Sequence, residues 1–481
     1  PTASISSPGD TLHVEVKIKN KSDSTLTGVF VNWSVNNIAH TTYNWSGSLA
    51  PGDSTTVYLG WVLAVSRANK IKVYTSQPNG FADQFPEDDT LTKVVTGCYS
   101  TLSGTYTVGP DVTDDYNTIS DLAIAISNCG MSGPVLVLID SGTYVDNLVL
   151  SYAPGSNLVN TLTITSASGN AADVVIQSPN GDPAISLQGM YGVTIKDITI
   201  NGLLNNSLPT SIGIQLKGGN RDIIIRDNII NTCGALVNAT TLQAILASTP
   251  ISRDSMVYII NNKLNGSGAI YLYYGSTMLG HDFTIDSNTI TNPYYYGIYT
   301  YYVNIRRVNE NFIFRDVAMA SYCYYGIYCP NSYGVPDAFT TINNNRLHGN
   351  FYAAMYITGI YSISSGWAVT KPLIIANNEV ILRGTASGYG AMTLWNSGGY
   401  TVIANNTFVN DVGSSRPYLF TTYTYNSQHF EVINNNFVNY GTLTSTMIYT
   451  NWATQQNYVD AWDYNNYWTG GVNLATWAGG V

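Results

Sequence analysis

The stretch INNNRL, residues 342–347, decides the fold, because close variants of it return along most of the chain. Most copies contain an apolar residue, a variable residue, Asn or Asp, a second Asn, a variable residue and another apolar residue. The other copies read IRDNII (225–230), IINNKL (259–264), IDSNTI (285–290), IANNEV (375–380), IANNTF (403–408), INNNFV (433–438) and DYNNYW (463–468).

The fourth position of this motif is an Asn in every copy, and we expect a structural corner of the fold there. Two degenerate copies place Ile198 and Asp316 in the same frame, so that successive corners are 26–34 residues apart. A repeat of this period is typical of a solenoid or a propeller. The predicted corner residues are Asn228, Asn262, Asn288, Asn345, Asn378, Asn406, Asn436 and Asn466.

The residue types between the corners favour a β-solenoid over a helical solenoid or a propeller. The repeats are rich in Ile, Val, Thr and Tyr with alternating polarity, which indicates strands rather than paired helices. Each repeat holds only two or three short strands, too few for a propeller blade. Coils stacked at about 4.8 Å bring equivalent side chains into register. A neutral Asn can donate to one neighbouring coil, accept from the other and tolerate a left-handed backbone, whereas stacked charges would repel.

The repeat resembles the PbH1 repeat of the right-handed parallel β-helix, the pectin-lyase-like fold. The resemblance rests on strands such as that in YYGIYTYYVN (295–304), followed by an NN corner as in TINNNRL (341–347), and it covers residues 98–481. It implies a right-handed parallel β-helix over residues 97–481, with an N-terminal capping helix at 118–130. It implies no single activity, because the family includes pectate lyases, polygalacturonases, epimerases, phage tailspikes and non-catalytic adhesins.

Residues 1–96 do not contain this repeat. They hold about seven short segments in which apolar and polar residues alternate, separated by turn-forming stretches such as APGDST (50–55). This pattern predicts a β-sandwich of immunoglobulin-like architecture. The segment also resembles CARDB-like modules in secreted proteins of Bacteroidetes-type bacteria, which implies a spacer. Beyond it, the pattern of TISDLAIAISNCG (118–130) predicts an amphipathic helix that ends at a glycine. Cys98 and Cys129 flank this region and can form a disulfide; the sequence leaves open whether they do.

The composition excludes several partners. Charged residues make up 10% of the chain and the net charge is -10, with 43 Gly and 37 Tyr among the 481 residues. Without a basic cluster, we expect no nucleic-acid binding. No apolar stretch reaches the roughly 18–20 residues of a membrane span, so direct membrane insertion is not expected. The opening residues carry no signal peptide, and we expect any export signal to lie outside this sequence and the natural chain to continue past Val481.

An aromatic stripe is the strongest candidate binding feature. On the strand before each corner, apolar residues should face the interior and the residues between them should face outward. Four consecutive repeats place Tyr at the same outward position, with further aromatics beside it. The stripe can stack on sugar rings, or can stabilise the coils by stacking on itself. Its predicted residues are Tyr271, Tyr299, Tyr301, Tyr328, Tyr356 and Trp395.

The sequence contains no complete catalytic signature, and we assign no catalytic residue. The closest candidates are Asp282 and Glu310, each six residues before its predicted corner. If both point outward they would lie about 5 Å apart, as in a retaining glycosidase. We expect no cofactor, although Glu87, Asp88 and Asp89 leave open a Ca²⁺ site as the alternative to a charged linker.

These observations predict a monomeric protein, secreted or exposed on a bacterial cell surface, that binds a polysaccharide or surface glycan or mediates adhesion through its stripe. The alternatives are a polysaccharide lyase or glycoside hydrolase, and a rigid segment of a large surface protein. Whether the chain is an enzyme stays open, and the sequence does not identify the ligand.

Overall fold

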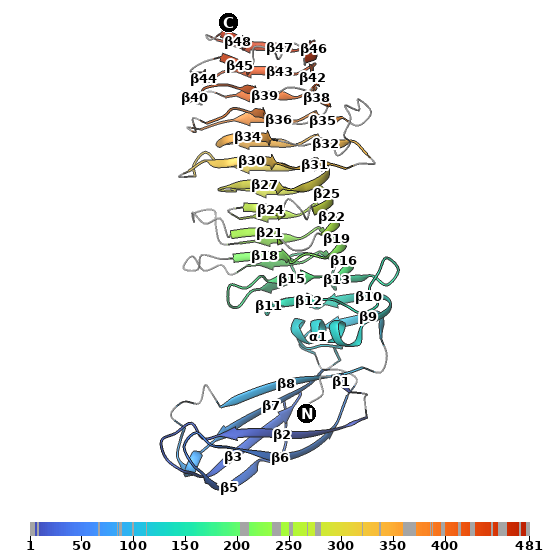
Figure 1. The fold of residues 1–481 in the computed structure, drawn as a ribbon, viewed down its shortest axis with the longest axis vertical. Helices are drawn as coiled ribbons and strands as arrows, with labels where there is room; N and C mark the ends of the chain where they lie inside the picture. Colours follow the sequence, from blue (N-terminus) through green and yellow to red (C-terminus); the bar gives the residue numbers. More distant parts are fainter. Residues whose placement is uncertain are drawn as a thin grey trace. The chain divides into compact units, whose positions relative to one another are not determined.

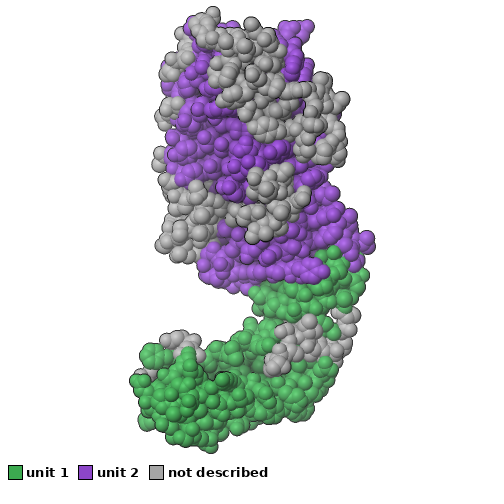
Figure 2. Space-filling view, viewed as in Figure 1, with its two compact units in different colours: residues 1–135, 153–156 green, residues 136–152, 157–481 purple. Residues whose placement is uncertain are grey.

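A computed structural model describes residues 5–477 except 7–8, 66–67, 84, 86–88, 99–100, 112, 203–210, 233–241, 250–253, 267, 275–279, 320, 336–337, 359–371, 385, 387, 396–399, 412–414, 424–428, 444–445, 451–458 and 471–472. The chain forms two compact units, residues 1–135 with 153–156 and residues 136–152 with 157–481, coloured separately in Figure 2. The second unit contains most of the repeats.

The first unit begins with a sandwich of two sheets, as predicted. One sheet pairs β2 (Thr11–Lys19) with β6 (Ser54–Leu63) in antiparallel fashion. Residues at alternating positions, such as Val14, Val31 and Trp33, are buried in one common core, while their neighbours face outward. The other sheet contains β1 (Ile5–Ser6), β8 (Thr90–Gly97), β7 (Ala68–Ser76), β3 (Leu26–Val35), β4 (Ile38–Ala39) and β5 (Tyr43–Leu49), and a short 3-10 helix, η1 (Pro78–Gly80), precedes β8.

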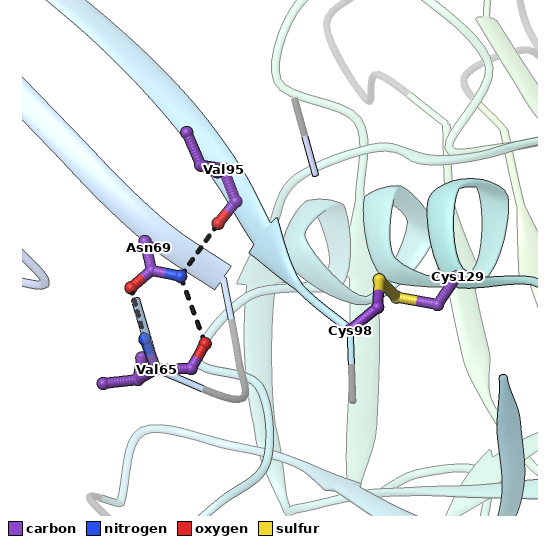
Figure 3. Close-up of a disulfide and its surroundings, with 5 residues drawn as sticks. All are labelled: Val65, Asn69, Val95, Cys98 and Cys129. Carbon is purple, nitrogen blue, oxygen red and sulfur yellow. Dashed lines mark hydrogen bonds between the residues drawn. A yellow bond between two sulfur atoms is a disulfide. The ribbon is translucent and has the colours of Figure 1, made fainter. Parts of the chain in front are cut away.

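The predicted helix is present as α1 (Ile119–Cys129). The Thr118 side chain accepts a hydrogen bond from the backbone N–H of Asp121 at its start, and the helix ends at Gly130, whose φ is 67°. Cys98, which follows β8, forms a disulfide with Cys129, the last residue of α1 (Figure 3). Within the first unit, this bond joins the sandwich covalently to the helix.

The repeats form a stack of coils whose strands make up three long sheets (Figure 1). Sheet 1 consists of β9 (Leu102–Val108), β10 (Met131–Ile139), β13 (Leu162–Ser166), β16 (Tyr191–Lys196), β19 (Arg221–Arg226), β22 (Ser255–Ile260), β25 (Gly280–Asp286), β28 (Val303–Asn309), β31 (Tyr333–Gly334), β32 (Thr340–Asn343), β35 (Leu373–Ala376), β38 (Tyr400–Ala404), β42 (His429–Ile433) and β46 (Val459–Asp463).

Sheets 2 and 3 supply the other two sides of each coil. Sheet 2 consists of β11 (Gly142–Val145), β14 (Val174–Gln177), β17 (Thr199–Asn201), β20 (Ile229–Asn231), β23 (Lys263–Asn265), β26 (Thr289–Thr291), β29 (Phe312–Arg315), β33 (Arg346–Gly349), β36 (Glu379–Leu382), β39 (Thr407–Asn410), β43 (Asn436–Asn439) and β47 (Asn466–Thr469). Sheet 3 consists of β12 (Leu148–Ser151), β15 (Ile185–Gln188), β18 (Ser211–Leu216), β21 (Leu242–Thr249), β24 (Gly268–Tyr274), β27 (Tyr296–Tyr301), β30 (Cys323–Pro330), β34 (Phe351–Thr358), β37 (Met392–Trp395), β41 (Phe420–Tyr423), β45 (Thr446–Thr450) and β48 (Asn473–Trp477).

Neighbouring strands in sheets 2 and 3 pair in parallel, and each belongs to the next coil along the chain. A short two-stranded pair, β40 (Ser415–Arg416) with β44 (Thr442–Leu443), lies outside the three sheets. Inward positions such as Ile270, Ile298 and Ile327 stack in register and are fully buried. The chain is therefore all-β, as predicted, and its repeats form a right-handed parallel β-helix.

A ladder of Asn side chains, all buried except the last, runs through the corner between sheets 1 and 2. Asn345 shows the repeating pattern: its Oδ1 accepts from the backbone N–H and the Nδ2 of Asn311, and its Nδ2 donates to Val308 O and to Asn378 Oδ1, all at 2.8–3.0 Å. The residue before each ladder Asn has a positive φ, as in Asn344 at 58°. The ladder members are Asn228, Asn262, Asn288, Asn311, Asn345, Asn378, Asn406, Asn435 and Asn465.

The ladder corrects three of the predicted corners. Asn435 and Asn465, rather than Asn436 and Asn466, carry the ladder, and the predicted residues instead begin strands β43 and β47. Asn311 takes the place predicted for Asp316. Ile198 lies where expected, since its backbone N–H donates to Asn228 Oδ1.

Candidate functional site

The predicted tyrosine column lies on sheet 3, at one register position of four consecutive coils. Backbone pairing aligns Tyr271 with Tyr299, Tyr299 with Tyr328, and Tyr328 with Tyr356. The next coil places Thr393 at this position. The alternation of each strand directs these side chains away from the buried apolar positions beside them. The structure therefore brings the predicted column together.

A second column follows two residues later on the same strands. Tyr273 is aligned with Tyr301, and Trp395, several coils further along, is aligned with Tyr423. Tyr273 is 39% exposed, whereas Tyr299 and Tyr356 in the first column are only 9% and 7% exposed. Accessible area is thus concentrated at the margin of the columns.

The aromatic surface is wider than predicted. Tyr296 and Tyr325 form a third aligned position, with nearly parallel rings 5.9 Å apart. Tyr352 and Tyr389 extend it, with Tyr389 lying 5.4 Å from Tyr356. The runs YYYGIYTYY (294–302) and YCYYGIY (322–328) contain the signal for this enlargement. We refer to the set as the tyrosine face: Tyr271, Tyr273, Tyr296, Tyr299, Tyr301, Tyr325, Tyr328, Tyr352, Tyr356 and Tyr389.

Neighbouring tyrosine rings pack against one another, so that each ring covers a face of the next. The Tyr271 and Tyr299 rings are 4.6 Å apart and inclined by 13°, and the Tyr273 and Tyr301 rings are 4.9 Å apart and inclined by 10°. The Tyr328 ring meets that of Tyr299 edge-on, at 5.4 Å and 63°. A sugar therefore cannot lie flat on most of these rings, because another tyrosine already covers the face.

The phenol hydroxyls are the polar part of the tyrosine face. Within the described residues, the Tyr271, Tyr299 and Tyr301 hydroxyls have no hydrogen-bond partner, and no tyrosine hydroxyl is among the buried unpartnered oxygens. These hydroxyls therefore reach solvent. Burial raises the pKa of Tyr271 and raises that of Tyr296 to about 12, so the face stays uncharged at neutral pH.

The predicted catalytic pair is not formed. The Asp282 carboxylate is buried and accepts two hydrogen bonds from Arg306, at 2.6 and 2.8 Å. Glu310 instead occupies the left-handed position just before the ladder Asn311, where Ser287 Oγ donates to it at 3.1 Å. The predicted pairing was wrong because it counted six residues back from Asp316, which is not a corner.

The suggested Ca²⁺ site is not described, because Glu87 and Asp88 lie outside the described residues. Asp89 accepts a hydrogen bond from the Thr75 hydroxyl at 2.7 Å. In the described part of the chain, no helix is long and apolar enough to cross a membrane.

A buried acid on sheet 1 makes stability depend on pH. Burial raises the pKa of Asp286 from 3.8 to about 6, although Arg307 opposes the shift. The folded state then holds this proton more tightly than the unfolded chain. The stability that the carboxyl contributes is present below about pH 4 and is lost as the pH rises through about 6. Buried Asp254 is shifted in the same direction.

We therefore predict that the urea midpoint of the β-helix falls between pH 4.5 and pH 7, with each such acid contributing up to about 1.4 kcal/mol per pH unit. Asp286→Asn should reduce this decline, because Asn stays neutral at both pH values. Asp411→Asn removes a more exposed ion pair with Arg383 and should leave the decline intact. An unchanged pH slope in Asp286→Asn would contradict the assignment.

Comparisons with known proteins find distant likenesses in structure only. No family model matches the chain, and no curated protein matches it. A GH87 α-1,3-glucanase from Streptomyces thermodiastaticus is 13% identical with a TM-score of 0.39, covering 96% of this chain and 91% of its own. A pectin methylesterase from Aspergillus niger is 12% identical with a TM-score of 0.30, covering 78% and 93%.

A family 28 exopolygalacturonase from Yersinia enterocolitica is likewise 12% identical, with a TM-score of 0.25 and 98% of both chains covered. Likenesses this distant carry no argument about activity. The fold assignment therefore rests on the parallel strand pairing of the three sheets and on the Asn ladder between two of them.

Proposed function

We propose that this protein binds a neutral polysaccharide along the tyrosine face. The observation that carries the proposal is the in-register alignment of uncharged tyrosines on successive coils, among which the Tyr271 and Tyr299 hydroxyls have no hydrogen-bond partner in the described residues. Each hydroxyl can donate and accept one hydrogen bond, which suits the hydroxyls of a sugar chain. The first column spans three coil steps, or about 14 Å, so it can contact several sugar units.

The charge of the chain supports a neutral ligand. Few charged residues are present, and the chain is net negative, so an anionic pectate or alginate would meet repulsion rather than a basic groove. The partly exposed rings at the margin, Tyr273 and Trp395, add apolar area beside the hydroxyls. Recognition then combines hydrogen bonds along the columns with ring contacts at the edge.

A structural role is the second candidate, and the stacked rings favour it. The Tyr271–Tyr299 and Tyr273–Tyr301 stacks join consecutive coils and stabilise them by about 0.5–1.5 kcal/mol per pair, with or without a ligand. On this account the chain is a rigid segment of a larger surface protein.

We also propose that the protein works outside the cell. The Cys98–Cys129 disulfide supports this location, since such bonds persist in oxidising compartments. The sandwich, as a CARDB-like module, would act as a spacer for the β-helix in adhesion. Cell fractionation that recovers the protein with a reduced Cys98–Cys129 pair in the cytoplasm would contradict this proposal.

Affinity electrophoresis against a panel of neutral and acidic polysaccharides tests the binding proposal. At least one neutral polymer should retard the protein, and Tyr301→Ala with Tyr328→Ala should weaken that binding at least tenfold. Tyr440→Ala is a matched control, because Tyr440 is 54% exposed and lies outside the tyrosine face. Absence of binding to every neutral polymer would overturn the proposal and leave the structural role.

A further inference from the structure

A polar groove lies away from the tyrosine face, where sheet 2 meets the corner from sheet 1. It encloses about 530 Å³ and is lined by Glu310, Asn311, Phe312, Asn344, Arg346, Asn377 and Glu379. Phe312, Arg346 and Glu379 are aligned on three consecutive coils of sheet 2. Asn344 and Asn377 follow Glu310 at the left-handed corner positions, so the groove runs between two columns of side chains.

Neighbouring side chains hold the two carboxylates while leaving each one oxygen available. His348 Nε2 lies 2.5 Å from Glu379 Oε1, and the His348 and Phe312 rings meet nearly at right angles with their centroids 5.6 Å apart. On the other side, Ser287 Oγ donates to Glu310 Oε2. The remaining oxygens, Oε2 of Glu379 and Oε1 of Glu310, have no hydrogen-bond partner among the described residues.

The guanidinium of Arg346 has no bonding partner among the described residues. In the described part of the chain its side chain makes no ion pair and no hydrogen bond, although Glu379 is its in-register neighbour. Arg346 therefore brings a planar set of donors to the middle of the groove, between acceptors from the coils on either side. Phe312 supplies an apolar ring surface on the adjacent coil.

We propose that this groove is a second binding site, which takes a neutral sugar unit. Carboxylates accept hydrogen bonds from adjacent hydroxyls, a guanidinium donates to hydroxyl or ring oxygens, and an aromatic ring packs on the apolar side of a pyranose. The two carboxylates would repel an anion, and Arg346 would repel a cation. A neutral polyol therefore fits the groove best. Two coil steps of about 4.8 Å and this volume suit a disaccharide.

This site does not depend on the tyrosine face, which lies on sheet 3. A short neutral sugar can fill the groove alone, whereas the tyrosine columns need a longer chain to contact several coils. Binding of disaccharides and binding of polymers therefore report on the two sites separately. Failure of one proposal leaves the other testable on the same protein.

Saturation-transfer NMR with neutral disaccharides, such as cellobiose, maltose and laminaribiose, tests the groove in the full chain. At least one should show transfer at about 10 mM or below, and Arg346→Ala should weaken its binding at least tenfold. Glu379→Gln should also weaken it. Lys263→Ala removes a cation at the same register position two coils before Phe312 and should bind as the wild type does.

Three outcomes would overturn the proposal. These are no transfer to any neutral disaccharide at that concentration, wild-type binding by Arg346→Ala, or transfer only to a uronic acid disaccharide. Changing Tyr271 and Tyr299 to Phe should leave disaccharide binding intact. If that variant loses disaccharide binding while Arg346→Ala keeps it, the sugar occupies the tyrosine face and the groove proposal fails.

Discussion

Asn345→Ala is expected to lower the free energy of unfolding of the β-helix by about 3–6 kcal/mol. The substitution removes a buried side chain that bridges three coils. It removes the partner of the Asn311 backbone N–H, one of the two bonds donated by Asn311 Nδ2, and the side-chain bonds to Val308 O and Asn378 Oδ1, all in a site closed to water. Asn378 Oδ1 keeps only the backbone N–H of residue 345. Each orphaned group costs about 1–3 kcal/mol, and these costs add along one network. Urea unfolding followed by far-ultraviolet circular dichroism measures the change.

The neighbouring Asn344 provides the matched control. It lies one residue earlier, is exposed and has a φ of 58°, a conformation that Gly adopts without strain. Asn344→Gly should therefore change stability by less than about 1 kcal/mol. A loss in Asn344→Gly equal to that in Asn345→Ala would show that the corner conformation, and not the ladder, determines stability.

Removing the Cys98–Cys129 disulfide is expected to destabilise the first unit by about 3–4 kcal/mol. The bond closes a loop with a sequence separation of 31 residues, and the loop-closure entropy of the unfolded chain gives this magnitude. Cys98→Ser with Cys129→Ser should lower the urea midpoint of that unit, and dithiothreitol should reproduce the loss in the wild type.

The double variant is its own control for the reductant, because dithiothreitol should have no further effect on it. Equal stability of wild type and double variant would contradict a stabilising role for the bond. A shift by dithiothreitol in the double variant would assign the effect to another thiol.

The sequence predicted the β-helix because one side chain, Asn, must recur wherever a coil turns and stacks on itself. It misplaced the corner at Asn436, since Val432 and Ile433 are both apolar and either can open the motif. The structure buries Val432 completely and leaves Ile433 partly exposed, which moves the ladder to Asn435. Which of two adjacent apolar residues is buried depends on the folded coil, so the sequence alone could not show it.

The corner at Asn311 was missed for a different reason. The stretch VNENFI, residues 308–313, fits the motif except that Glu310 occupies the third position, where most copies have Asn or Asp. Coil lengths on either side are also unequal, with 23 residues from Asn288 to Asn311 and 34 from Asn311 to Asn345. An even period therefore favoured Asp316, and this shift created the false pairing of Asp282 with Glu310.

The candidate site was predictable in position but not in chemistry. Alternation along the strands placed Tyr271, Tyr299, Tyr328 and Tyr356 in one outward column, as the register shows. The tilt of each ring depends on its neighbours above and below and has no counterpart in sequence. That tilt moves the proposed contact with sugar from ring faces to hydroxyls.

The most direct test of the account is the affinity of a neutral polysaccharide for Tyr271→Phe with Tyr299→Phe. This variant keeps both stacked rings and removes only two hydroxyls, each worth about 0.5–1.5 kcal/mol in hydrogen bonds. We predict about tenfold weaker binding with an unchanged urea midpoint. Wild-type affinity in this variant would contradict recognition through the tyrosine hydroxyls.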